Sequence, residues 1–210
     1  MAQAKRKTRT QKNNWLGWLF FTIIFGLLIG GVFLIRNFDT STSNEPNFTE
    51  QMKSFFKPDG SVATFNLAGN TLVESTTWLN EQFVQLIIVN NGGTKQEIYR
   101  IGEQTIDLVF YAPRIEHAQT FTAAELQNLQ AIDTILHWPL TSKSFGSKTM
   151  TYPVPFETSY LIFANAVSVE RSDESGKTIN YYAEGYGFIG REYFINDTLF
   201  HSIQLNILTE

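Results

Sequence analysis

The sequence predicts a mainly β protein. Its fold class is a single N-terminal transmembrane helix followed by an extracytoplasmic antiparallel β-sandwich or jelly roll with one or two short helices. Residues 15–35 form a run of 21 residues without a charge, which is typical of a membrane span. Beyond residue 61, short segments that alternate apolar and polar side chains are separated by turn-forming residues. That alternation is typical of half-buried antiparallel strands.

The apolar run 15–35 is long enough to cross a bilayer as a helix, since at ~1.5 Å per residue it spans about 31 Å. A cleaved signal peptide typically has a shorter apolar region of about 7–15 residues, so we expect an uncleaved anchor. Gly26 and Gly30 have the spacing that lets two helices approach closely. They are a candidate helix–helix contact through which the chain could form a homo-oligomer.

Charge is distributed unevenly along the chain and predicts its orientation. Residues 1–14 carry five Lys or Arg and no acid, whereas the residues from 37 onward carry 10 Lys or Arg and 20 Asp or Glu. Because basic flanks stay on the cytoplasmic side, we expect a cytoplasmic N-terminus and an exported acidic domain. Such a domain repels phosphate backbones, which excludes nucleic acid as its partner.

These observations divide the chain into four parts: a basic cytoplasmic tail, the transmembrane helix, a polar stalk that acts as a tether, and an extracytoplasmic β-rich domain. Their predicted bounds are 1–14, 15–35, 36–46 and 47–210. The chain contains no cysteine, so the domain has no disulfide and depends on core burial for stability.

Two short helices are predicted within the domain. The first follows a cap at Asn47, places apolar residues at helical spacing and ends at Pro58. It would cover one end of the domain or lie on the membrane surface. The second begins with a capping box formed by Thr122 and Glu125, and it must end before Pro139.

The remaining segments predict antiparallel strands joined by tight turns. The clearest turns are 90–93, 172–176 and 196–197. Residues 135–140 could already be strand, so the boundary between the second helix and the next strand stays open. The expected strands are 62–67, 72–79, 82–89, 95–101, 105–112, 149–154, 159–170, 178–186, 188–195 and 199–208.

Gly185, Gly187 and Gly190 match the spacing of a dinucleotide-binding loop. That chemistry needs a helix N-terminus after the glycines to hold the pyrophosphate, and residues 191–195 instead have the pattern of a strand. The glycines therefore predict a curved or bulged strand, and we expect no cofactor. The three histidines are scattered without metal-ligand spacing, and no catalytic constellation is recognisable, so no metal or catalytic residue is predicted.

Aromatic residues are dense around these glycines. Aromatic side chains can line a recognition surface for a glycan or a protein. The alternative is that those on one face belong to the core, because strand alternation buries every second residue. The candidate recognition aromatics are Tyr181, Tyr182, Tyr186 and Tyr193.

One segment, about residues 134–169, has a recognisable arrangement. Ile135 to Trp138 is followed by a Gly/Ser/Lys stretch, then by Tyr152 to Phe156 with two prolines, then by an apolar stretch. This order resembles the C-terminal knob domain of bacteriophage tail fibres, although the usual glycine after the tryptophan is missing. The resemblance implies a β-rich binding domain. A membrane anchor is foreign to that family.

The predicted function is that of a single-pass membrane protein whose exported β-rich domain is a non-enzymatic binding or assembly module. Its partners would be the membrane and a protein or glycan outside the cytoplasm. One alternative is a structural subunit of an envelope-spanning secretion machine or of a virion membrane. Another is an exported hydrolase, which a deep cleft with acidic groups of raised pKa would favour.

Overall fold

The computed structural model describes residues 48–210. The predicted basic tail, transmembrane helix and stalk lie outside the described residues, as do Gly26 and Gly30. Within residues 48–210 there is no helix of the length and apolarity needed to cross a membrane.

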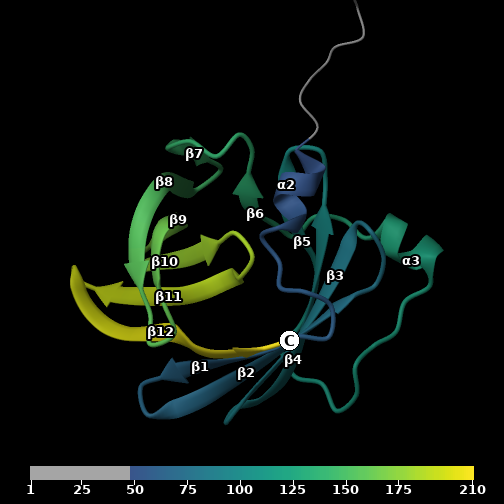
Figure 1. Ribbon diagram of the computed structural model, residues 1–210, viewed down its shortest axis with the longest axis horizontal. Coiled ribbons are helices and arrows are strands. Elements are labelled where there is room, and N and C mark those ends of the chain that lie inside the picture. The colour runs from purple at the N-terminus through teal and green to yellow at the C-terminus, as the bar shows by residue number, and fades with distance from the viewer. Residues whose placement is uncertain (1–47) are drawn as a thin grey trace, which may run out of the picture. The chain divides into compact units, whose positions relative to one another are not determined.

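The domain is built on a single antiparallel sheet of twelve strands (Figure 1). Every pairing joins consecutive strands except one, in which the first strand pairs with the last. The strands are β1 (Val62–Leu67), β2 (Asn70–Trp78), β3 (Phe83–Asn90), β4 (Gly93–Ile101), β5 (Thr105–Ala112), β6 (Asp133–His137), β7 (Lys143–Phe145), β8 (Lys148–Glu157), β9 (Ile162–Asp173), β10 (Gly176–Ala183), β11 (Gly187–Ile195) and β12 (Thr198–Thr209). Their order in the sheet is β6-β5-β4-β3-β2-β1-β12-β11-β10-β9-β8-β7.

The predicted antiparallel, mainly β class is confirmed, and the predicted two-sheet sandwich or jelly roll is wrong. Alternation specifies which side chains share a face of the sheet, but it does not specify which strands pair over a long sequence separation. The pairing of β1 with β12 joins the two halves of the chain into one sheet. Strand β7 was not predicted, and the open boundary at 135–140 is resolved as strand up to His137.

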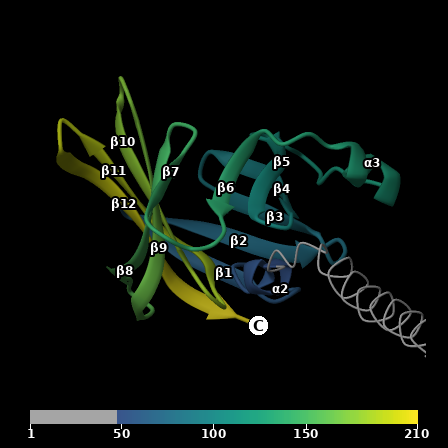
Figure 2. The same cartoon turned by 90° about the horizontal axis from the view of Figure 1, so that it is seen from above.

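The two edge strands, β6 and β7, are consecutive in the sequence, and the sheet curls until they lie close together (Figure 2). We call this junction the seam. Lys148 on β8 donates hydrogen bonds across it to Asp133 Oδ2 and to the carbonyl oxygen of Thr134, each at 2.6 Å. The Nζ of Lys143 lies 2.9 Å from His137 Nδ1, and burial lowers the pKa of Lys143. Side chains therefore link the two edges of the curled sheet.

Helix α2 (Thr49–Lys53) and the residues after it close one end of the curled sheet, as predicted for this segment. Met52 and Phe55 are buried in the core. Phe48, rather than Asn47, occupies the N-cap position and makes no side-chain cap hydrogen bond. Gly187 approaches this segment so closely that a Cβ there would lie 2.9 Å from the Phe55 carbonyl oxygen.

Helix α3 (Ala123–Asn128) packs on the outer face of the sheet, and its predicted capping box is confirmed. The hydroxyl of Thr122 accepts a hydrogen bond from the Glu125 amide, and the Glu125 carboxylate accepts one from the Thr122 amide. Leu126 is the buried residue of the helix, and its cluster on the outer face contains Phe83, Ile98 and Val109.

Gly187 and Gly190 lie in a bulged strand, β11, as the sequence predicted, whereas Gly185 lies in the turn before it. The register between β10 and β11 shifts at Tyr181/Tyr182. A Cβ on Gly190 would lie 2.5 Å from Cε1 of the Phe156 ring and 2.7 Å from the Ile203 carbonyl oxygen. The bulge turns both Phe188 and Arg191 into the interior of the curled sheet, where both line a cavity.

Candidate functional site

The interior of the curled sheet holds a cavity of about 510 Å³. Ten strands contribute to its wall, β2–β6 and β8–β12. Because residues two apart on a strand point to the same face, each strand presents a short ladder of side chains to the cavity. We call the end of the cavity next to the β9–β10 turn the mouth and the end closed by the residues after α2 the floor. The order of the inward-facing side chains along each strand determines how polarity changes from the mouth to the floor.

The ladders on β9 and β10 change from polar to apolar. Strand β10 presents Thr178 near its β9–β10 turn, then Asn180, then Tyr182. Strand β9 presents Arg171 at the level of Thr178 and Val169 at the level of Asn180. The cavity therefore has a charged mouth next to the β9–β10 turn and a less polar floor.

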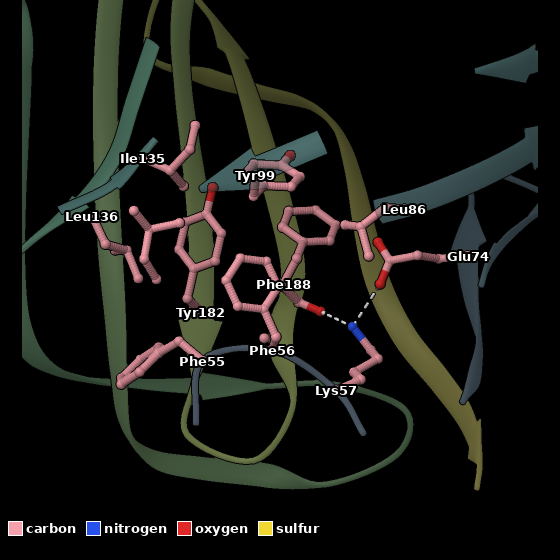
Figure 3. Close-up of a pocket in the computed structure, with 12 residues that line it drawn as sticks. Phe55, Phe56, Lys57, Glu74, Leu86, Tyr99, Ile135, Leu136, Tyr182 and Phe188 are labelled. Atoms are coloured by element: carbon pink, nitrogen blue, oxygen red, sulfur yellow. Dashed lines mark hydrogen bonds and ion pairs between the residues drawn. The ribbon is translucent and has the colours of Figure 1, made fainter. Parts of the chain in front are cut away.

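The floor is a narrower pocket lined mainly by aromatic and aliphatic side chains, with a free volume of about 30 Å³ (Figure 3). The rings of Tyr182 and Phe188 have centroids 5.9 Å apart, and those of Phe56 and Tyr99 are 5.6 Å apart. Phe56 belongs to the segment after α2 that closes this end of the sheet, which we call the plug. The plug therefore also supplies part of the floor. Six residues, among them Tyr99, Tyr182 and Phe188, line both the floor pocket and the larger cavity.

A buried ion pair lies at the side of the floor. Lys57 Nζ is 2.7 Å from Glu74 Oε1, and the two side chains are 2% and 3% exposed. Lys57 also donates to the Phe188 carbonyl oxygen at 3.0 Å, and both contacts are drawn in Figure 3. Taking two charges out of water is costly, so the pair persists only because each charge has partners.

A second network is centred on Glu97 of β4. Its carboxylate accepts hydrogen bonds from Lys95 Nζ at 2.7 Å and from the Tyr99 hydroxyl at 2.6 Å. Burial, followed by the charge of Glu97, raises the pKa of Tyr99 well above its ordinary value. Tyr99 therefore stays protonated at neutral pH and acts as a hydrogen-bond donor.

The cavity and its floor are lined by five cationic groups and four carboxylates. Lys57, Lys95 and Lys148 are each paired with a carboxylate. Arg171 and Arg191 also line the cavity, and neither forms an ion pair within residues 48–210. The fourth carboxylate, Asp173, lies near enough to Arg171 for the two charges to interact, so Arg191 is the cation of the cavity wall that has no acid beside it in the described part of the chain.

The four candidate recognition tyrosines do not form one surface. Tyr182 lines the cavity, whereas the ring of Tyr181 stacks on Phe156 with centroids 3.8 Å apart. Tyr186 packs edge-to-face against Phe163. The fourth tyrosine, Tyr193, packs near His201 and donates to the Ser175 carbonyl oxygen.

Sequence reasoning missed the polar residues of the cavity, Lys57, Glu74 and Glu97. One signal was present in the sequence. Glu74 stands between Leu72 and Thr76 on the buried ladder of β2, where a charged residue interrupts an otherwise inward-facing series. A carboxylate at such a position requires a buried partner.

The β9–β10 turn at the mouth supports one pH-dependent prediction. Hydrogen bonds from the Ser175 side chain and then from its amide lower the pKa of Asp173. Asp173 therefore stabilises the fold above its ordinary pKa, and that contribution is lost as the pH falls through the lowered value. We expect Ser175→Ala to raise the pKa of Asp173 towards its ordinary value, and Ser172→Ala to leave it unchanged. NMR titration of the Asp173 carboxyl measures both.

Comparisons with known proteins give no family. No family model matches the chain, and no curated protein matches it. Two solved structures resemble it at low similarity. A candidate exported protein with a YmcC-like fold from Bacteroides fragilis is 13% identical, with a TM-score of 0.48 over 74% of this chain and 98% of that chain. A candidate lipoprotein from Parabacteroides distasonis is 14% identical, with a TM-score of 0.38 over the same shares. Both scores are too low to inform the fold or the function.

Proposed function

We propose that the β-rich domain is a non-enzymatic module that binds a small amphipathic molecule inside its curled sheet. The observation that carries the proposal is the ladder on β10, which runs from Thr178 at the mouth to Tyr182 at the floor. A cavity of about 510 Å³ lies within the usual volume range of small-molecule sites. A wall that is polar at one end and aromatic at the other suits a ligand with a polar head and an apolar body.

The arrangement of the acids favours binding over hydrolysis. Of the four acids that line the cavity, three, Glu74, Glu97 and Asp133, are each held by a lysine ammonium group at 2.6–2.7 Å. The fourth, Asp173, accepts hydrogen bonds from Ser175 in the exposed β9–β10 turn. A general acid or base needs a free path to the substrate proton. These carboxylates instead hold lysines or a turn, so the exported hydrolase is the less favoured alternative.

The location of the module follows from the sequence. We propose that residues 15–35 anchor it, that residues 36–46 tether it, and that the acidic domain lies outside the cytoplasm. A helix–helix contact through Gly26 and Gly30 would bring two cavities to the same patch of membrane. A protein or glycan partner outside the cytoplasm, which the sequence predicted, would then receive or deliver the ligand.

Photolabelling of the full chain tests the cavity directly. The chain is placed in neutral phosphatidylcholine nanodiscs with decanol that carries a diazirine near the end of its chain. The labelled residues are then identified by mass spectrometry. We expect labels on β10 and β11, and an about tenfold loss in Leu108→Trp, which fills the cavity from β5.

The matched control is Leu161→Trp, which adds the same ring at an exposed position outside the cavity. It should label like the wild type, and near-ultraviolet circular dichroism should show that both variants are folded. Equal labelling of Leu108→Trp and Leu161→Trp would refute binding inside the sheet.

A further inference from the structure

We propose that the ligand is an amphipathic anion whose carboxylate or phosphate head binds Arg191, Tyr182 and Arg171, with its apolar tail directed to the floor of the cavity. This inference rests on the proposed binding function and specifies the chemistry of the ligand. It comes from two guanidinium groups that form no ion pair and one hydroxyl group that makes no hydrogen bond within residues 48–210, all three on residues that line the cavity.

Arg191 is the central group. It is half-buried on β11, and its Nε donates to Asn180 Oδ1 at 2.6 Å. Its guanidinium carbon lies 5.7 Å from the centroid of the Phe188 ring. Within the described residues its Nη atoms make no hydrogen bond and its charge has no carboxylate. A planar fork of free N–H donors in a partly dehydrated wall is suited to a bidentate carboxylate or phosphate.

Tyr182 supplies an uncharged hydrogen-bond donor that lies closer to the floor than Arg191. It faces Phe188 across the β10–β11 pairing, and Arg191 faces Asn180 on the other side of the register shift at Tyr181/Tyr182. Burial raises the pKa of Tyr182, so the hydroxyl stays protonated. That hydroxyl makes no hydrogen bond to any residue in the described part of the chain. Its position between the guanidinium level and the aromatic floor allows it to donate to the inner side of an anionic head.

Arg171 supplies a second positive charge nearer the mouth. On β9 it stands opposite Lys148 of β8 on one side and Thr178 of β10 on the other. Two like charges directly opposite each other on neighbouring strands destabilise a sheet. Lys148 is drawn across the seam to Asp133, and Arg171 forms no ion pair, although the charge of Asp173 acts on it from two residues along the same strand. Arg171 therefore adds positive charge at the mouth, and Arg191 remains the main contact of the anion.

The apolar tail extends from the head group toward the floor of the cavity. Below Arg191 and Tyr182 the cavity is lined by Leu86, Ile135 and Phe188, while the opposite direction leads to the charged mouth. Burial of the tail against these side chains supplies the hydrophobic part of the affinity. A free fatty acid and an anionic membrane lipid share this chemistry.

The test compares two photoactivatable probes on the full chain in neutral nanodiscs: decanoic acid and decanol with the same diazirine. For the wild type, we expect the acid to label the cavity strands at an about tenfold lower concentration than the alcohol. We expect Arg191→Gln to abolish that difference, because labelling by the acid falls to the level of the alcohol. For Arg191→Lys we expect a preference for the acid between that of the wild type and that of Arg191→Gln, because lysine keeps the positive charge and lacks the paired N–H donors of the guanidinium group. Arg114→Gln, an exposed arginine outside the cavity, is the matched control.

The outcomes separate the two proposals. If the acid and the alcohol label the wild type equally, or if Arg191→Gln keeps the preference for the acid, the anion site is refuted and the binding cavity stands. If neither probe labels the cavity strands, the proposed function fails as well. Near-ultraviolet circular dichroism matching that of the wild type shows that Arg191→Gln is folded.

A second arm identifies the source of the anion. Nanodiscs that contain phosphatidylglycerol with a photoactivatable tail replace the added probe. Labelling of the cavity strands from the disc supports the anion site with a membrane lipid as its ligand. Labelling by added decanoic acid alone supports it with a soluble ligand.

Discussion

Replacing Lys57 with methionine should lower the free energy of unfolding by about 3–5 kcal/mol, because it leaves a buried carboxylate without its counter-ion. Glu74 is 3% exposed and its only ion-pair partner in residues 48–210 is Lys57. The Phe188 carbonyl oxygen also loses a donor. Urea unfolding of the full chain in neutral nanodiscs, followed by near-ultraviolet circular dichroism, measures the loss.

Two further variants make this prediction specific. The double variant Lys57→Met/Glu74→Leu should recover most of the lost stability, since it removes both charges and fills the same space. Lys53→Met breaks ion pairs with two exposed glutamates and should change the stability little. If Lys57→Met lowers the free energy of unfolding no more than Lys53→Met does, or if the double variant is less stable than Lys57→Met, then an unpaired Glu74 carboxylate is not what destabilises the fold.

Replacing Trp138 with alanine should cost about 3–5 kcal/mol of stability, because it empties a large volume in the core. Trp138 is 2% exposed and directly follows β6 at the seam. Its amide donates to the Gln104 carbonyl oxygen at 2.7 Å. Its ring meets that of Phe55 edge-to-face with centroids 5.2 Å apart, which connects the plug after α2 to the seam.

The same urea experiment tests this connection. Phe55→Ala combined with Trp138→Ala should show a coupling of about 0.5–1.5 kcal/mol beyond the loss of buried area. Phe200→Ala removes an aromatic ring that is 69% exposed and should change stability by less than about 0.5 kcal/mol. A Trp138→Ala variant as stable as Phe200→Ala would show that the seam and the plug do not share a core.

Local pairing could be predicted because it depends on turn residues close in the sequence. Asn196 and Asp197 both adopt positive φ, 49° and 58°, which is the geometry of the tight hairpin that their side chains favour. The pairing of β1 with β12 could not be predicted, since it joins strands more than a hundred residues apart. That one pairing determines whether two half-sheets stack as a sandwich or continue as one curled sheet.

The site was less predictable than the fold for a physical reason. Tyr181 and Tyr182 are adjacent and equally aromatic, yet they point to opposite faces, so only Tyr182 reaches the cavity. The bulge at Gly190 decides that Arg191 points inward, and a one-residue change of register reverses the face of every later residue. A short aromatic segment therefore identifies the correct region of the chain without identifying the residues that face a ligand.

Native mass spectrometry of the full chain released from its own membranes shows whether the curled sheet encloses an amphipathic anion. If it does, the wild type and Leu161→Trp should carry a bound molecule of that class, and Leu108→Trp should carry none. Equal loads on Leu108→Trp and the wild type, or a wild type that carries nothing, would show that no such ligand binds inside the sheet.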